Sequence, residues 1–534
     1  MHEELLLILG LLFVVMLLVM LAQRIRVAYP IFLVLAGLGI GFVPGIPAVR
    51  LDPQLIFLIF LPPLLYEAAW YTSWKEFKKW KNAIALLAFG LVLITSAGVA
   101  FAAQYILPGF TLALGFLLGG ITSPPDAVAA TTVLKGLKVP RRTITILEGE
   151  SLVNDASSLI VFRFALAAVL TGAFSFQQAT GQFFTVAGLG VVVGLLGAHI
   201  MYVIHRFMPT TAAIDAALTV MTPYILFLSA EHFHFSGVMA VVSGGLFMSF
   251  RAHEIFKTGN TRLNMVSVWH TLIFVMNALV FVLIGLDLPE IVRGLGDLSL
   301  LQAVKYGLLT GVVVILIRLM WVFATAHIPP LFAKPGQRGP SPGWKNPLII
   351  GWEGMRGVVS LATALSIPLY MNDGKAFPHR DLIIFITFVV ILITLVFQGL
   401  TLPAVIRLTG IGEIDPVLPE HEQHAGIRLR LDTVALQRLN AKHITSSGNS
   451  LLMAYAEKLQ HEIAGHRQYL SSVEACTNRD AEREEFRQVM ADIHDRQRQE
   501  LFTMKNERTY TDDAIRKAEH LLDINDLRIA ENTL

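Results

Sequence analysis

The stretch ITILEGESLVNDASSLIVFRFALAAVL, residues 144–170, is long and apolar enough to cross a membrane as a helix. It nevertheless contains Glu150, Ser151, Asn154 and Asp155. A carboxylate inside a membrane-spanning helix costs roughly 2.5–3.5 kcal/mol on insertion scales, so a chain that keeps two of them is expected to use them. On a helix, Glu150 and Asn154 are i,i+4 neighbours, as are Ser151 and Asp155. These four side chains can therefore present oxygen ligands to a hard cation or a transported proton.

The composition of the whole chain also indicates a membrane protein. Of its 534 residues, 54% are hydrophobic and 15% are charged, whereas charged residues make up about 25% of a soluble protein. The formal net charge of +2 gives no reason to expect a nucleic-acid partner. The single cysteine, Cys476, excludes an intramolecular disulfide framework, and no Cys/His cluster has zinc spacing. No cofactor is expected.

Apolar segments of spanning length predict an all-α polytopic membrane protein with about 13 transmembrane helices. The first segment follows the N-terminus directly and has no cleavage-site signature, so it is interpreted as a retained span rather than a signal peptide. The segments lie near residues 5–22, 27–43, 54–71, 83–106, 111–134, 143–170, 183–204, 212–232, 235–250, 266–287, 299–325, 346–371 and 382–407.

The charges in the loops predict the orientation of these spans. If the N-terminus is outside, the cytoplasmic loops contain 17 Lys and Arg residues and the opposite loops contain 4. Because Lys and Arg gather in cytoplasmic loops, this difference favours an outside N-terminus and a cytoplasmic C-terminus. Residues 1–410 then form the membrane domain. Residues 411–534 are rich in Glu, Arg, His and Gln and predict a helical cytoplasmic tail, with one helix starting near Leu451. The tail could be a packing or dimerising appendage, or its histidines could have a regulatory, pH-sensing role.

Two spans have interrupted sequences. TLALGFLLGGITSPPDAVAATTVLKG, residues 111–136, places Pro124 and Pro125 at mid-depth, directly before Asp126. Two consecutive prolines remove two backbone donors and break the helix. The simpler interpretation is a proline kink with Asp126 as an N-cap. In the functional interpretation, the freed carbonyl oxygens of residues 122–125 also help to bind a cation, because free carbonyls at membrane depth require protein or a wet cavity beside them.

The second interruption is IIGWEGMRGVVSLATALSIP, residues 349–368, in which Glu353 and Arg356 are separated by three positions. They could form an ion pair within one helix. Alternatively, Arg356 could compensate dipoles or carboxylates where two broken helices cross. Arg318 is a lone base in another apolar helix and therefore requires a carboxylate partner. Broken spans in both halves of a chain are typical of an inverted-repeat transporter.

The motifs GGITSPPDAVAATTVL, LEGESLVNDASSLIV and GWEGMRGVVSLA resemble those of the monovalent cation:proton antiporters, in the Asn-Asp branch. Together with FLPPLLYEAA at residues 60–69, they are similar to bacterial NhaP-type Na+/H+ antiporters and to animal sodium/proton exchangers. The resemblance covers roughly residues 1–410. It implies an NhaA-like fold with inverted repeats and two crossing broken helices. It also implies a homodimer in the cell membrane, in which a core domain moves against an interface domain.

The resemblance further implies roles for individual residues in the ion site. Asp155 matches the ion-binding aspartate of the family, and Asn154 matches the asparagine that marks the electroneutral branch. Glu150 and Ser151 match neighbouring ligand-side residues, which places sodium at Asp155, Glu150 and Ser151. Asp126 matches the acidic residue of the first broken helix.

Other matches concern charges and backbone groups around that site. The carbonyl oxygen of Pro125 is included among the expected ion ligands. Arg318 and Arg356 match intramembrane arginines, and Arg318 is expected to pair with Glu150. Glu67 matches an acidic residue near the cytoplasmic entrance for the cation.

Exchange can follow from competition at one carboxylate. Asp155 can hold a proton or a cation but not both, and if only the loaded site crosses, transport is an obligatory exchange. Asn154 adds no titratable group, so one cation can replace one proton without net charge movement. The chain is therefore expected to be a Na+/H+ antiporter that serves pH regulation, with a K+/H+ antiporter as the alternative. A cation channel gives no reason for paired broken helices. An intramembrane hydrolase would need a Ser-His pair or HExxH at membrane depth, and neither is present.

Overall fold

The computed structural model of the protein describes residues 2–25, 27–43, 53–134, 137, 139–172, 176–256, 258–295, 298–332, 343–412, 420–441, 450–471, 476–506 and 512–531. Within these ranges every regular element is a helix, apart from an isolated antiparallel bridge between Tyr370 and Ala376. The chain divides into two compact units, Met1–Asp415 and Pro416–Leu534.

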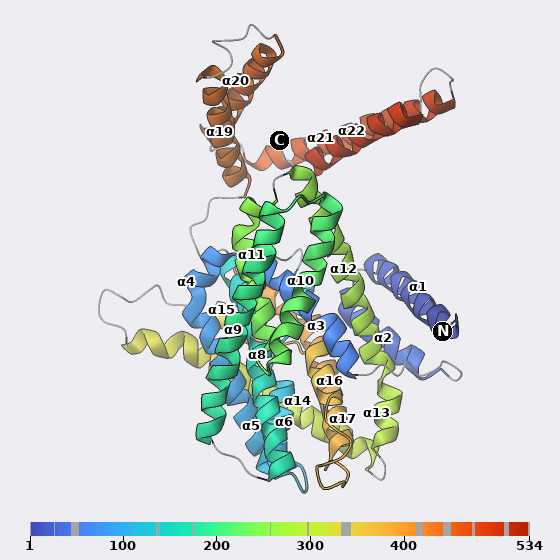
Figure 1. Ribbon diagram of the computed structural model, residues 1–534, viewed down its shortest axis with the longest axis vertical. Helices are drawn as coiled ribbons and strands as arrows, with labels where there is room; N and C mark the ends of the chain where they lie inside the picture. The colour runs from blue at the N-terminus through green and yellow to red at the C-terminus, as the bar shows by residue number, and fades with distance from the viewer. Residues whose placement is uncertain are drawn as a thin grey trace. The chain divides into compact units, whose positions relative to one another are not determined.

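The first unit is built from helices (Figure 1), most of which are apolar. Its first half contains α1 (His2–Arg24), α2 (Tyr29–Gly41), α3 (Pro53–Tyr71), α4 (Trp74–Ala85), η1 (Leu86–Leu91), α5 (Val92–Ile106), α6 (Leu112–Thr122), α7 (Ala127–Leu134), α8 (Arg141–Thr171) and α9 (Phe176–Phe207). Its second half contains α10 (Ala212–His232), α11 (Gly237–Ile255), α12 (Gly259–Leu286), α13 (Leu288–Gly294), α14 (Leu300–Phe332), α15 (Lys345–Trp352), α16 (Val358–Leu365), α17 (Arg380–Leu392), η2 (Ile393–Gln398) and α18 (Gly399–Thr409).

Each predicted apolar segment coincides with one of these helices or with a broken pair of them. Among the described residues, seven helices are long and apolar enough to cross a membrane. Shorter apolar helices add Leu9–Arg24, Tyr29–Gly41 and Leu112–Thr122. The chain is therefore a multi-pass, all-helical membrane protein, while the count of 13 spans and the inverted repeats stay predictions.

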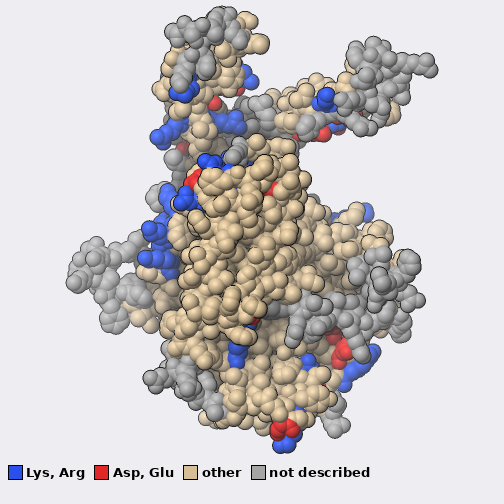
Figure 2. All heavy atoms as spheres, in the orientation of Figure 1, with Lys and Arg blue, Asp and Glu red and all other residues tan. Residues whose placement is uncertain are grey.

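The outer surface of the first unit is apolar over a broad area. Figure 2 shows a face of this unit that is almost free of charged side chains over the middle of its helices. On α9, Phe184, Leu196 and Ile200 are 70%, 62% and 61% exposed. Such exposure is costly in water and favourable in lipid, so these side chains are suited to face the hydrocarbon.

Both interrupted segments form broken helices. Residues 123–126 separate α6 from α7, and residues 353–357 separate α15 from α16. The prolines Pro124 and Pro125 account for the first break because they cannot donate backbone hydrogen bonds. At the second break, a Cβ on Gly357 would lie 1.8 Å from the Asp126 carboxylate. Glycine at this position therefore lets the second break approach the first.

In the described part of the second unit there are four helices, α19 (Glu420–Leu439), α20 (Ser450–Ser471), α21 (Cys476–Asn506) and α22 (Asp512–Glu531). α20 begins one residue before Leu451, where a helix start was predicted. α19 packs against α20, and α21 packs against α22. In the second pair, Arg498 donates to Asp523 at 3.0 Å and also to Asp526, which contacts His494. These side-chain contacts join α21 to α22.

Candidate ion-binding site

Asn154 connects the long helix α8 to the break in the α6–α7 span. Its Nδ2 atom donates to the carbonyl oxygen of Pro125 at 3.1 Å, and the Asn154 side chain is fully buried. The Asn154 Oδ1 atom is also buried and has no hydrogen-bond partner among the described residues. Because a buried amide oxygen without a partner costs free energy, this atom is available to a ligand in the site.

Asp155 follows Asn154 and is 7% exposed. Asp126, in the break, lies close enough to Asp155 for the two carboxyl groups to interact electrostatically. Ser151 is half-buried on the preceding turn of α8. The structure therefore places Asn154 in contact with the Pro125 carbonyl, with Asp155 and Asp126 beside them, while the predicted binding of a cation by these groups stays a prediction.

The two breaks cross each other. The Asp126 backbone N–H donates to the carbonyl oxygen of Met355 at 2.7 Å. Nε of Arg356 donates to the Thr122 carbonyl at 3.0 Å, and Nη2 donates to the Ser123 carbonyl at 3.4 Å. Of the two interpretations for Arg356, the structure supports compensation of freed dipoles at the crossing. The guanidinium therefore donates to two of the carbonyls at residues 122–125 that were predicted to bind the cation.

Arg318 supplies the second buried positive charge. Its Nη1 and Nη2 donate to the two carboxylate oxygens of Glu150 at 2.5 and 3.0 Å, which confirms the predicted pair. Arg318 also lies 3.5 Å from Glu353 and donates through Nε to the Ile350 carbonyl at 3.3 Å. Glu353 therefore pairs with Arg318 on α14 rather than with Arg356 in its own segment. Both Glu150 oxygens have an arginine partner, and the role of Glu150 as a sodium ligand stays a prediction.

Glu67 is half-buried on α3. It lies within electrostatic range of Tyr29, which hydrogen-bonds Thr132 and is also within range of Asp126. The structure thus places Glu67 in the neighbourhood of the first broken span, and its role at an entrance stays a prediction.

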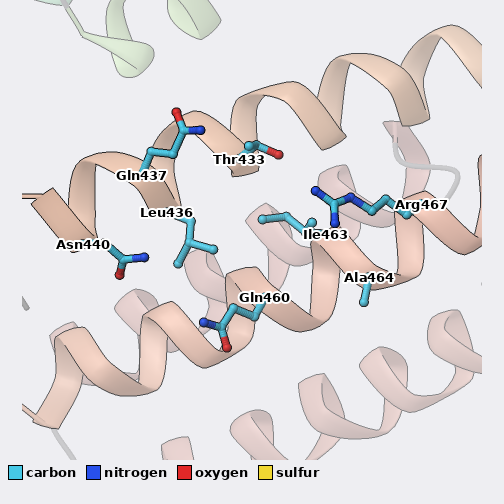
Figure 3. Close-up of a pocket in the computed structure, with 8 residues that line it drawn as sticks. All are labelled: Thr433, Leu436, Gln437, Asn440, Gln460, Ile463, Ala464 and Arg467. Carbon is cyan, nitrogen blue, oxygen red and sulfur yellow. The ribbon is translucent and has the colours of Figure 1, made fainter.

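A cavity of about 280 Å³ lies elsewhere, between α19 and α20 of the tail (Figure 3). Its lining combines amide and hydroxyl groups with apolar side chains and Arg467. It contains none of the residues predicted for the ion site. The residues predicted for the ion site all belong to the first unit.

Similarity to known proteins shows to which family the chain belongs. A family model described as the transmembrane sodium/hydrogen exchanger matches residues 10–408. The chain belongs to this exchanger family. It is therefore a transporter of the monovalent cation:proton antiporter type and not an enzyme.

Individual relatives of this exchanger extend over most of its length. An uncharacterized Na+/H+ exchanger of Mycobacterium tuberculosis is 30% identical over 96% of this chain and 93% of its own. The Na+/H+ antiporter ApNhaP of Aphanothece halophytica is 35% identical over 72% of this chain and 70% of its own. The structure of the sodium proton antiporter MjNhaP1 from Methanocaldococcus jannaschii has a TM-score of 0.57, at 23% identity over 77% of this chain and 100% of its own. This last likeness shows a shared fold.

Two contacts of the helix breaks could not be anticipated from the sequence. One involves Thr394, which accepts a hydrogen bond from the Arg356 backbone N–H at 3.0 Å. A threonine within the apolar run ITLVFQ gives no signal of this role, since most such hydroxyls bond only to their own helix. The backbone contact of Met355 with Asp126 was also missed, because it depends on tertiary approach of the two breaks.

Proposed function

We propose that the protein exchanges a monovalent cation, most simply Na+, for H+ across the cell membrane, with Asp155 as the shared binding group. The proposal rests chiefly on one observation, the hydrogen bond from Asn154 to the Pro125 carbonyl. It fixes the helix that carries Asp155 against a break in another helix, where the Asn154 amide oxygen and the carboxylates of Asp155 and Asp126 lie beside the Pro125 carbonyl. Oxygen groups of this kind suit a hard cation.

Competition between the two ions follows from the properties of this carboxylate. A protonated Asp155 offers a neutral O–H group, whereas an ionised Asp155 attracts a cation. Both ions cannot be held at once, and a site that crosses only when loaded couples the two fluxes. Asn154 adds no titratable group, and Arg318 neutralises Glu150 nearby. One cation for one proton, without net charge transfer, is the stoichiometry that these residues favour.

We further propose that the protein is a homodimer in which a core domain carries the site across the membrane against an interface domain. The N-terminus lies outside and the tail is cytoplasmic, as the loop charges favour. Light scattering of the purified protein tests the dimer, and accessibility of introduced cysteines to impermeant reagents tests the orientation.

Proteoliposomes test the exchange itself. The wild-type protein should release protons from a dye-loaded lumen when Na+ is added outside. Asp155→Asn should reduce this signal to that of protein-free liposomes. Asp373→Asn is the matched control, because Asp373 is an exposed carboxylate in a loop, paired with Lys375 at 3.0 Å. Full exchange by Asp155→Asn would reject Asp155 as the shared group.

Broader cation selectivity is a second candidate. A relative in Bacillus subtilis, 32% identical over 83% of this chain, is named a sodium, potassium, lithium and rubidium/H+ antiporter. Repeating the assay with K+, Li+ and Rb+ distinguishes a sodium-specific exchanger from a broad one.

A further inference from the structure

We propose that Thr394 is a positioning residue for the cation site, holding both helix breaks in register through Arg356. The proposal rests on the proposed function, since it assigns Thr394 an effect on cation binding at Asp155. It concerns a hydroxyl on η2, a π-helical turn of the Arg380–Thr409 span. π-helical turns within α-helices occur frequently at functional sites.

The Thr394 hydroxyl makes contacts in two directions. It donates to the carbonyl oxygens of Val390 and Ile391 of its own helix at 2.8 and 3.2 Å. It also accepts the backbone N–H of Arg356 at 3.0 Å. Thr394 is fully buried. A hydroxyl can donate and accept at once, so it fits this position, whereas a methyl group of the same size would leave the Arg356 N–H unpaired.

Arg356 transmits this contact to the first break. Its main chain is held by Thr394, while its guanidinium donates to the carbonyls of Thr122 and Ser123. Pro125, two residues beyond Ser123, accepts the Asn154 amide. A displacement of Arg356 therefore shifts the backbone that anchors Asn154.

The helix behind Thr394 is suited to be a fixed reference for the site. Residues 382–391 of α17 are all buried, and they precede η2 directly. A group mounted on a packed helix is held more precisely than one on a loop. In the break at residues 353–357, the Arg356 N–H donates to Thr394 on another helix, so an external acceptor matters there.

The same helix provides a matched control in Thr387. This threonine is also fully buried, and its hydroxyl donates to the Ile383 carbonyl of its own helix at 2.8 Å. Thr394→Val and Thr387→Val therefore remove the same atom from the same buried helix. They differ in whether a hydrogen bond to the second break is lost.

The experiment measures Na+-dependent exchange in proteoliposomes for the full chain. Thr394→Val should raise the half-saturating Na+ concentration about tenfold, the effect expected from the loss of one hydrogen bond to a buried group. Thr394→Ser should restore it, and Thr387→Val should leave it unchanged. The melting temperature in detergent should fall further for Thr394→Val than for Thr387→Val, because only Thr394→Val leaves a buried N–H unpaired. If Thr394→Val does not fold, Thr394→Ala compared with Thr394→Ser gives the same test.

Two results would overturn the inference. One is a half-saturating Na+ concentration in Thr394→Val, or in Thr394→Ala, equal to that of Thr387→Val. The other is a serine variant as impaired as the valine or alanine variant, which would show that the methyl group matters rather than the hydroxyl. Asp155→Asn separates this failure from that of the proposed function. If it abolishes exchange while Thr394→Val behaves as wild type, only the positioning role is rejected.

Discussion

Arg318 on α14 donates to both carboxylate oxygens of Glu150 on α8, and both side chains are almost completely buried. The paired geometry is the strongest form of an arginine–carboxylate contact. Neither group could be buried alone, because an isolated charge in a low-dielectric interior is very costly. The pair therefore fixes α8, the helix that carries Asn154 and Asp155, against α14.

Removal of one partner should destabilise the protein strongly. Arg318→Met leaves Glu150 and Glu353 without their arginine, and Glu150→Gln leaves Arg318 with only the longer contact to Glu353. Breaking a buried pair typically costs about 3–5 kcal/mol. The apparent melting temperature in detergent should fall for each single variant. The double variant should recover part of that loss, since Glu150 and Arg318 are then both replaced by neutral groups, while Glu353 still loses its contact with Arg318.

An exposed pair serves as the control for this prediction. Arg163 on α8 contacts Glu231 on α10 at 2.8 Å, with side chains that are 49% and 29% exposed. Pairs of this kind contribute about 0–1 kcal/mol. Arg163→Gln should therefore melt close to wild type. If Glu150→Gln melts as high as Arg163→Gln, the buried pair has no special role in stability.

Asn154 is predicted to act as a donor and not only as a neutral neighbour of Asp155. Asn154→Asp keeps the shape but replaces Nδ2 with a carboxylate oxygen, which cannot donate to the Pro125 carbonyl when ionised. The loss should cost about 1–3 kcal/mol of stability and weaken Na+ binding. Thermal unfolding and the Na+ dependence of exchange measure the two effects.

The control for Asn154 is Ser157→Ala. Ser157 lies on the same helix, and its hydroxyl donates to the Val153 carbonyl of that helix at 3.3 Å. This variant should leave exchange unchanged. An Asn154→Asp variant that binds Na+ as well as Ser157→Ala does would show that the contact with Pro125 is not needed.

The sequence predicts the parts of the site that depend on local chemistry. Two prolines must break a helix, an arginine in an apolar helix requires a carboxylate, and polar residues at i,i+4 share a face. These rules correctly anticipated the break before Asp126 and the pairing of Arg318 with Glu150. They apply within one segment, or to charges whose burial cost leaves few alternatives.

Contacts that involve the backbone of two distant segments were not predictable in this way. The Asp126 N–H donates to the Met355 carbonyl, and the Thr394 hydroxyl accepts from the Arg356 N–H, because the two breaks lie against each other. Every residue has a backbone carbonyl and every residue except proline has a backbone N–H, so the sequence alone does not select the pair. Glu353 illustrates the same limit. Its spacing suggested a partner in Arg356, but tertiary packing placed Arg318 beside it.

The tail should respond to acid through Asp526. Arg498 and His494 lower the pKa of the Asp526 carboxyl below its usual value. A carboxyl with a lowered folded pKa stabilises the folded state above its unfolded pKa of about 3.9, and this stabilisation is lost as the pH falls through the folded pKa. The α21–α22 hairpin should therefore loosen below about pH 4. Spin labels on the two helices of the full chain measure the opening.

Two variants isolate the contribution of Asp526 to this acid response. Asp526→Asn removes the titrating group, so the distance between the labels should depend less on pH. Asp495→Asn is the control, because the Asp495 side chain is 73% exposed and lies 3.6 Å from Arg498. A response in Asp526→Asn identical to that in Asp495→Asn would assign the acid sensitivity to other groups.

Exchange should be electroneutral because one group in the site is free to titrate. Glu150 is paired with Arg318, Asn154 cannot ionise, and Asp155 remains as the group that holds either ion. Asp126 is the carboxylate that could add a second proton. It lies directly before α7, where the positive end of the half-helix favours a fixed negative charge.

In liposomes with a fixed Na+ gradient, the equilibrium pH difference should not change when K+ and valinomycin set different membrane potentials. A systematic change with potential would mean that a second proton moves. In that case Asp126→Asn should abolish the voltage dependence, whereas Asp373→Asn should leave it intact.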